Sequence, residues 1–73
     1  MIKKKTIFGK YLERKSINQA ALARTTRIRP NRISEFATQD CLKMRADEIY
    51  LIAKALGESP ARLLDYLLED VKS

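Results

Sequence analysis

Four arginines surround a single proline in the middle of the chain, within the stretch RTTRIRPNR. They are Arg24, Arg27, Arg29 and Arg32. Cations placed this closely repel one another, so folding alone does not favour such a cluster. The planar guanidinium group matches the oxygens of a phosphate, which makes arginine a common phosphate-binding residue. The cluster therefore indicates a polyanionic ligand outside the chain.

Charge is distributed unevenly along the 73 residues. Residues 1–45 hold twelve Lys and Arg against three acids, whereas residues 46–73 hold three against six, which gives a net charge of +6. A chain that is basic in its first part has a surface suited to a polyanion. Solubility alone would explain Lys3, Lys4 and Lys5, but it explains arginines gathered around one turn poorly.

Composition also narrows the chemistry. The chain has one cysteine, Cys41, and no histidine, so we expect no internal disulfide, no metal site of the His/Cys type and no cofactor. We predict that Cys41 packs as a small hydrophobic residue. The absence of a nucleophile–base set and of a glycine-rich phosphate loop predicts a protein that is not an enzyme. No apolar run matches a signal peptide or a membrane span, so we expect a cytoplasmic protein without a membrane partner.

Hydrophobic spacing predicts short helices throughout and no strand of useful length. The residues expected to begin or end these helices are Thr6, Asn18, Pro30, Gly57, Ser59 and Pro60. The third helix should run from Pro30 to about residue 37, and residues 38–44 should form a loop. Five helices in all are predicted.

These elements predict a single all-α domain over residues 1–73, folded as a compact five-helix bundle. Residues 1–5 are expected to form a basic N-terminal tail and residues 70–73 a C-terminal tail. A core this small provides little net stability, so helix packing or a partner subunit must support the fold.

Residues 18–37 have the pattern of a helix-turn-helix, whose second helix commonly enters the major groove of DNA. On a helical wheel, Ile33, Phe36 and Ala37 fall together and should face the core. The opposite side then presents Asn31, Arg32, Ser34 and Glu35. These polar side chains can hydrogen-bond base edges, although polar residues are also expected on the outside of any helix.

The stretches NQAALARTTRIRPNRIS and IAKALGESPARLL resemble the helix-turn-helix domain of the Cro/repressor type (XRE family). The matching positions are Asn18, Gln19, Leu22, Ala23, Ile28, Ile33, Ser34, Ile52, Ala53, Ala55, Leu56 and Gly57. The resemblance extends from about residue 7 to residue 68. It implies a lambda-repressor-like fold and sequence-specific binding of double-stranded DNA by a bacterial or phage transcriptional regulator.

The chain departs from the family pattern in three ways, which involve four residues. Arg27 stands where the turn usually has glycine, and in a left-handed conformation it would cost on the order of 1 kcal/mol. Arg29 replaces the usual Ser or Thr cap of the third helix and cannot accept an N–H bond. Leu12 and Ala37 replace a charged pair that joins the first and third helices in many relatives, so we expect ordinary apolar packing there.

The resemblance also implies roles for individual residues. Asn31, Arg32 and Glu35 match base-reading positions, and Ser34 lies beside them. Phosphate binding is expected from Asn18, Gln19, Arg27, Arg29, Lys43 and Arg45. The alternative for Gln19 is an ordinary helix-start residue, and the alternative for the last two is a solvated loop.

The expected partners are double-stranded DNA and a second copy of the chain, with the homodimer formed in solution or only on DNA. Leu51, Leu67 and Leu68 are predicted to contribute to the dimer surface. The alternative function is a protein-interaction module, such as the antitoxin of a toxin–antitoxin pair, with a toxin as partner. A free basic face favours the first function and an exposed apolar patch the second. RNA is less favoured, because a rigid helix reads its deep groove badly.

Overall fold

The computed structural model describes residues 5–69, so residues 1–4 of the predicted N-terminal tail (1–5) and the predicted C-terminal tail (70–73) lie outside the described residues. Within that range the chain is helical: α1 (Ile7–Arg14), α2 (Gln19–Thr26), α3 (Pro30–Thr38), η1 (Cys41–Lys43), α4 (Ala46–Leu56) and α5 (Pro60–Leu67). The all-α prediction is confirmed. The segment predicted as a loop contains η1, a single 3₁₀ turn. No helix of this part of the chain is long and apolar enough to cross a membrane.

The helices begin and end at the residues that the sequence indicated. Side chains of three N-caps accept backbone N–H groups: Thr6 Oγ1 from Gly9 at 3.0 Å, Asn18 Oδ1 from Ala21 at 3.1 Å and Ser59 Oγ from Arg62 at 3.1 Å. Gly57 ends α4 in the left-handed conformation, with φ 74°. Local capping chemistry therefore sets the helix boundaries.

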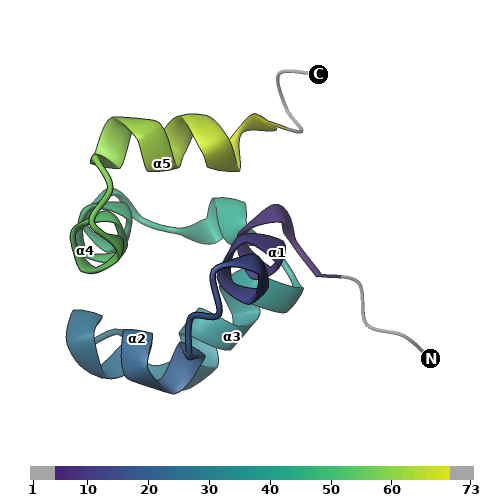
Figure 1. Cartoon of the computed structure of the whole chain (residues 1–73), viewed down its shortest axis with the longest axis vertical. Coiled ribbons are helices and arrows are strands. Elements are labelled where there is room, and N and C mark those ends of the chain that lie inside the picture. The colour runs from purple at the N-terminus through teal and green to yellow at the C-terminus, as the bar shows by residue number, and fades with distance from the viewer. Residues whose placement is uncertain (1–4, 70–73) are drawn as a thin grey trace.

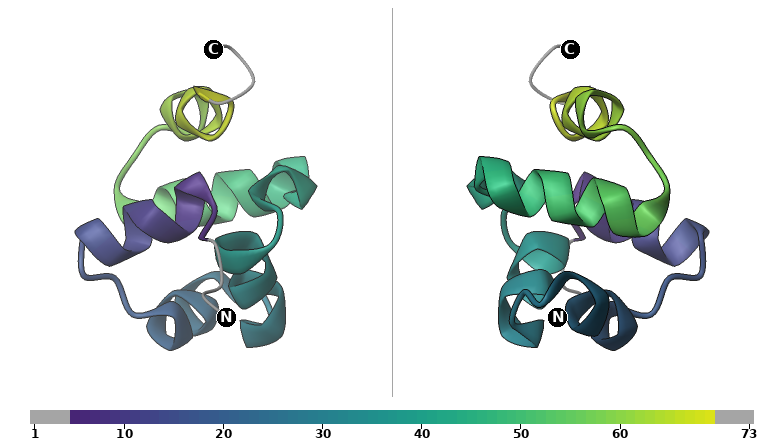
Figure 2. Two further views of the ribbon diagram at one scale, coloured as in Figure 1. Left: turned by 90° about the vertical axis from the view of Figure 1, so that its right-hand side faces the viewer. Right: turned by 90° about the vertical axis from the view of Figure 1, so that its left-hand side faces the viewer.

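The helices enclose one apolar core to which each of them contributes. Its largest fully buried side chains are Phe8, Leu12, Ile33, Phe36 and Ile52. Figures 1 and 2 show α2 and α3 together at one end of the molecule, α5 at the opposite end and α4 between them. The two helices of the helix-turn-helix are therefore mounted on α1 and α4, with α5 at a distance.

Leu67 and Cys41 both lie in the core, which contradicts the prediction for Leu67 and agrees with that for Cys41. Leu67, predicted on a dimer surface, is only 3% exposed, because α5 turns this face toward the other helices. It cannot contribute to a dimer interface without unfolding of α5. Cys41 is buried as predicted, and burial raises the pKa of its thiol.

The start of α1 lies against the end of α3. Thr6 donates twice to carbonyls there, from its N to Ala37 O at 3.0 Å and from Oγ1 to Phe36 O at 2.6 Å. A Cβ on Gly9 would stand 2.1 Å from Ala37 O, so only glycine permits this approach. Leu12 and Ala37 are both buried, which confirms apolar packing where relatives have a charged pair.

Candidate nucleic-acid interface

A three-residue turn joins α2 to α3, and its first residue has an unusual backbone. Arg27 has φ 64° and ψ 20°, and its N–H donates to Ala23 O at 2.8 Å. This is the left-handed geometry for which the family usually has glycine. The turn is therefore kept although an L side chain occupies it, at a cost in backbone strain.

Thr26 is a structural residue of the turn whose role is not evident from the sequence. Its side chain is buried, and Oγ1 donates to Leu22 O at 2.8 Å while it accepts from Ile28 N at 3.2 Å. The hydroxyl thus provides a partner for a backbone N–H that lies outside both helices. A threonine at the end of a helix gives no distinctive sequence signal for this role.

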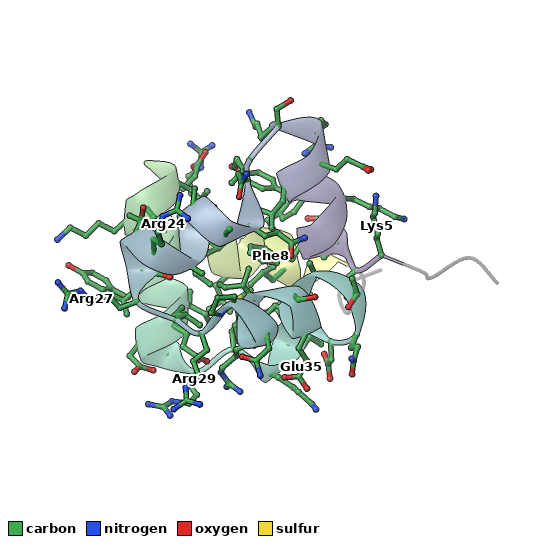
Figure 3. All side chains as sticks on the ribbon, turned by 90° about the horizontal axis from the view of Figure 1, so that it is seen from below. Lys5, Phe8, Arg24, Arg27, Arg29 and Glu35 are labelled. Atoms are coloured by element: carbon green, nitrogen blue, oxygen red, sulfur yellow. The ribbon has the colours of Figure 1, made fainter. Side chains whose placement is uncertain are left out.

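Exposed positive charge surrounds the turn. Arg24, Arg27 and Arg29 lie where α2 ends and α3 begins (Figure 3), and none of them forms an ion pair within residues 5–69. Arg29 is the N-cap of α3 without a side-chain cap bond, and Pro30 follows it at the first helical position. This end of α3 therefore combines three solvated guanidinium groups with the positive end of a helix.

The outward side of α3 is polar. Asn31 and Ser34 are exposed, and Glu35 is partly exposed, with its Oε2 accepting from Lys43 Nζ at 3.2 Å. Figure 3 shows Arg29 and Glu35 on the same side of the molecule. A nine-residue helix is about 13 Å long. A helix of this size fits the major groove, where amide, hydroxyl and carboxylate groups can meet base edges.

Arg32, the fourth predicted base-reading residue, is held within the protein. Its Nε and Nη2 donate to the two carboxylate oxygens of Glu48, the latter at 3.0 Å, and its Cζ lies 5.0 Å from the centre of the Phe36 ring. The pair joins α3 to the first turn of α4. This placement argues against a base-reading role for Arg32, whereas the base-reading roles of Asn31, Ser34 and Glu35 stay predictions.

Glu48 is a second residue that the sequence did not single out. It is 7% exposed, and besides the two Arg32 bonds its Oε1 accepts the N–H of Arg45, the N-cap of α4, at 2.8 Å. The hydrogen bonds from Arg32 hold the pKa of this carboxyl below its usual range despite its burial. A glutamate at this position suggests a capping box only when Ser or Thr is the N-cap, which is not the case here.

The other predicted phosphate-binding residues are exposed on neighbouring segments. Asn18 and Gln19 stand at the start of α2, with the Asn18 oxygen engaged as a cap. Lys43 pairs with Glu35, and Arg45 pairs with Asp47 at 3.1 Å across an exposed contact. Such exposed pairs are weak and can exchange for a phosphate. The roles of these four residues stay predictions.

The sequence profile of the Cro/C1-type HTH DNA-binding domain matches residues 9–69. Searches of curated proteins and of solved structures gave no match. The matched range contains all of α2–α5 and most of α1. The chain therefore belongs to the Cro/C1-type helix-turn-helix family of DNA-binding domains, and the resemblance noted in the sequence is confirmed.

Proposed function

We propose that the protein regulates transcription by binding particular sequences of double-stranded DNA, with α3 in the major groove. The observation that carries the proposal is the surface formed by α3 and the turn before it. Exposed Asn31 and Ser34 lie on α3, and the arginines beside them have no carboxylate partner in residues 5–69. Membership of a DNA-binding family supports the same ligand.

The residues of this surface suggest two separate roles, phosphate binding and base recognition. Arg24, Arg27 and Arg29 are long cations with no fixed partner, which suits phosphate contacts that are independent of sequence. Asn31 can make a bidentate contact with adenine, and Glu35 can accept from the N4 amino group of cytosine. Affinity would then come from the turn and specificity from the outward face of α3.

A salt titration with a matched pair of variants tests the proposal. If phosphates are bound, log K should fall linearly with log salt, with a slope of about −0.9 per phosphate. Arg29→Gln should reduce that slope by about one unit. Arg62→Gln removes the same charge from α5, at the end of the molecule opposite α2 and α3, and should leave the slope unchanged. Fluorescence anisotropy with a labelled duplex provides the measurement.

Two results would contradict the proposal. One is the absence of duplex binding at low salt, and the other is an affinity that does not change with salt. Equal effects of the two arginine variants would show that DNA is held by net charge rather than by the α2–α3 surface. Sequence specificity needs a separate experiment. Selection of duplexes from a random pool should identify a preferred site, and a pool without enrichment would contradict specific binding.

Apolar residues at the surface favour a second contact, with another protein chain. Leu51 is 38% exposed on α4, beside the exposed Tyr50, and Leu68 is partly buried after α5. We propose that Leu51 and Leu68 take part in a homodimer, which pairs two recognition helices on adjacent half-sites. A different protein bound at the same surface, such as a toxin, is the competing proposal.

A further inference from the structure

One buried carboxylate connects the segments that frame the proposed DNA-binding surface. Glu48 accepts from the side chain of Arg32 on α3 and from the backbone N–H of Arg45 at the start of α4. Arg32 Nη2 also approaches the carbonyl oxygen of Lys43, at 3.4 Å, at the end of η1. The cluster therefore links α3, which carries the proposed base contacts, to the loop that carries two proposed phosphate contacts.

The geometry points to Glu48 as a positioning residue for DNA recognition, acting through Arg32 and without touching DNA. In this inference, which rests on the proposed function, the Glu48–Arg32 pair sets the rotation of α3 and its distance from residues 43–45. Site preference would then depend on a carboxylate on α4. The inference assigns a role to Arg32 other than the base contact expected from its position.

The contacts suit a rigid link. Both oxygens of the carboxylate are used, and the guanidinium donates from two nitrogens in one plane, which fixes its direction as well as its distance. The fully buried Phe36 ring, which also belongs to α3, packs against the same guanidinium and so restricts the movement of the Arg32 side chain. The side chain of Glu48 is 9% exposed and that of Arg32 is 34% exposed, so water competes less for this pair than for the more exposed pairs at Lys43 and Arg45.

A fixed link matters because recognition needs two sets of contacts at once. Phosphate contacts from the loop set the register of the protein on the duplex, and base contacts from α3 are then made only if the helix lies at the right depth and rotation. Loss of the link would allow α3 to shift relative to Lys43 and Arg45. The side chains that read bases would remain present but would be poorly placed.

The sign of a charge effect gives a sharp test. Removal of a negative charge beside DNA ordinarily tightens binding to any sequence, because phosphate repulsion falls. Asp47→Asn makes this change at an exposed neighbour in the same helical turn, whose ion pair within residues 5–69 is with Arg45. Glu48→Gln makes the same charge change at the link. Charge alone predicts the same result for both variants, whereas the positioning role predicts opposite results at the preferred site.

The experiment compares affinities for the preferred duplex and for a random duplex at one salt concentration. All variants are compared at a temperature where circular dichroism shows them fully folded, so a purely structural loss of stability does not alter the ratio. Glu48→Gln should lower the preference for the best site by at least about fivefold, the contribution of one base contact. Asp47→Asn should keep the preference, and it should bind each of the two duplexes at least as tightly as the wild-type protein does.

Arg32 variants separate positioning from direct reading. If Arg32 positions α3, then Arg32→Met and Glu48→Gln should reduce the site preference by similar factors, and the double variant should be no worse than either. If Arg32 reads a base, Arg32→Met should relax preference at a single base pair, and Glu48→Gln should not. That second pattern would overturn the inference.

Glu48→Asp keeps the charge but shortens the reach, so it replaces Glu48→Gln if the amide variant does not fold. It should also lose site preference. A preference equal to that of the wild-type protein, in either Glu48 variant that folds, would overturn the inference. If the wild-type protein binds no duplex, the proposed function itself fails and the inference falls with it, so the two failures are distinguishable.

Discussion

Arg27 has a left-handed backbone conformation, which costs more free energy for an arginine than for a glycine. Its side chain lies beside the proposed position of the DNA. Arg27 and Ser16 are the non-glycine residues with positive φ in residues 5–69, at 64° and 56°. Ser16 precedes α2 and has no cationic side chain. The two positions therefore allow strain and charge to be tested apart.

Arg27→Gly should raise the free energy of unfolding by about 0.5–1 kcal/mol, because glycine relieves the left-handed strain and part of that gain is lost to its greater freedom in the unfolded chain. The same change should weaken binding to all duplexes. Ser16→Gly should give a similar stabilisation with unchanged affinity. Urea unfolding and anisotropy titrations measure the two effects. Unaltered DNA binding by Arg27→Gly would exclude a phosphate contact at this residue.

Asn31 and Arg29 should affect DNA binding in different ways. Asn31→Ala should relax preference at one base pair per half-site, by about 1–3 kcal/mol, if its amide contacts adenine. Arg29→Ala should lower the affinity for good and poor sites alike. Both side chains are exposed, so the helical circular dichroism should not change. If Asn31→Ala leaves the order of site affinities as it was, this side chain does not read the sequence.

At the scale of elements, the packing of α1 on α3 depends on one residue without a side chain. Alanine is normally favoured over glycine inside a helix by about 1 kcal/mol. At Gly9 the added methyl group would meet the backbone of α3, with 2.1 Å between Cβ and Ala37 O. Backbone cannot rotate away as a side chain can, so the two helices must separate.

We therefore expect Gly9→Ala to destabilise the protein by about 1–3 kcal/mol, the usual cost of overpacking. Gly57→Ala is the comparison, since nothing lies within 4 Å of a Cβ there and only the φ of 74° opposes it. Its cost should be about 1 kcal/mol. Thermal unfolding of both variants gives the measurement. A Gly9→Ala protein as stable as the wild type would contradict the close approach of α1 to α3.

The link between α3 and α4 should make stability depend on pH. The folded pKa of Glu48 is lowered, chiefly by the hydrogen bonds from Arg32, so the unfolded chain binds this proton more readily. Its contribution is therefore complete above the unfolded pKa of about 4.3 and is lost as the pH falls through the lowered folded value.

Urea midpoints measured from about pH 6 to about pH 3 should fall steeply for the wild type across this window. Glu48→Gln should start lower and show a flatter profile. The pKa of Asp47 is also lowered, by its hydrogen bond to Arg45, but the pair is exposed. Asp47→Asn should therefore keep most of the slope. Equal slopes for the wild type and Glu48→Gln would show that the pair does not stabilise the fold.

These elements show what a sequence can and cannot reveal. The caps Thr6, Asn18 and Ser59 and the stop at Gly57 depend on residues a few positions apart, so the helices were predictable. The Arg32–Glu48 pair joins residues 16 positions apart, and no periodic pattern relates them. A helical wheel predicts that Arg32 lies on the outer side of α3. It does not predict that the long side chain bends toward a neighbouring helix, because the sequence does not give the position of that helix.

At the scale of the whole molecule, the prediction concerns assembly. One recognition helix reads few base pairs, so two copies on half-sites about one helical turn apart are expected to bind together. Leu51→Asp should reduce cooperative binding to a duplex with two half-sites. Leu42→Asp is the control, because Leu42 is also exposed, at 50%, but lies on η1. It should leave cooperativity unchanged.

Sedimentation with and without the two-site duplex measures the number of subunits. A complex with one subunit on the best-bound site would refute the dimer. If Leu51→Asp behaves as Leu42→Asp does, Leu51 is not part of the contact between copies. Leu67 is not a useful target, since its burial would make any loss of binding a consequence of unfolding.

Thr6 has a consequence for the transfer of specificity between proteins. Its N–H and hydroxyl donate to the last carbonyls of α3, and the same hydroxyl caps α1. Residues 18–37 grafted alone into another scaffold would lose these donors and the apolar cover from α1, so the end of α3 should fray. The helix-turn-helix is therefore not expected to keep its structure when it is transferred without α1. A new binding preference is better installed by exchanging outward side chains such as Asn31 and Ser34 on the intact chain.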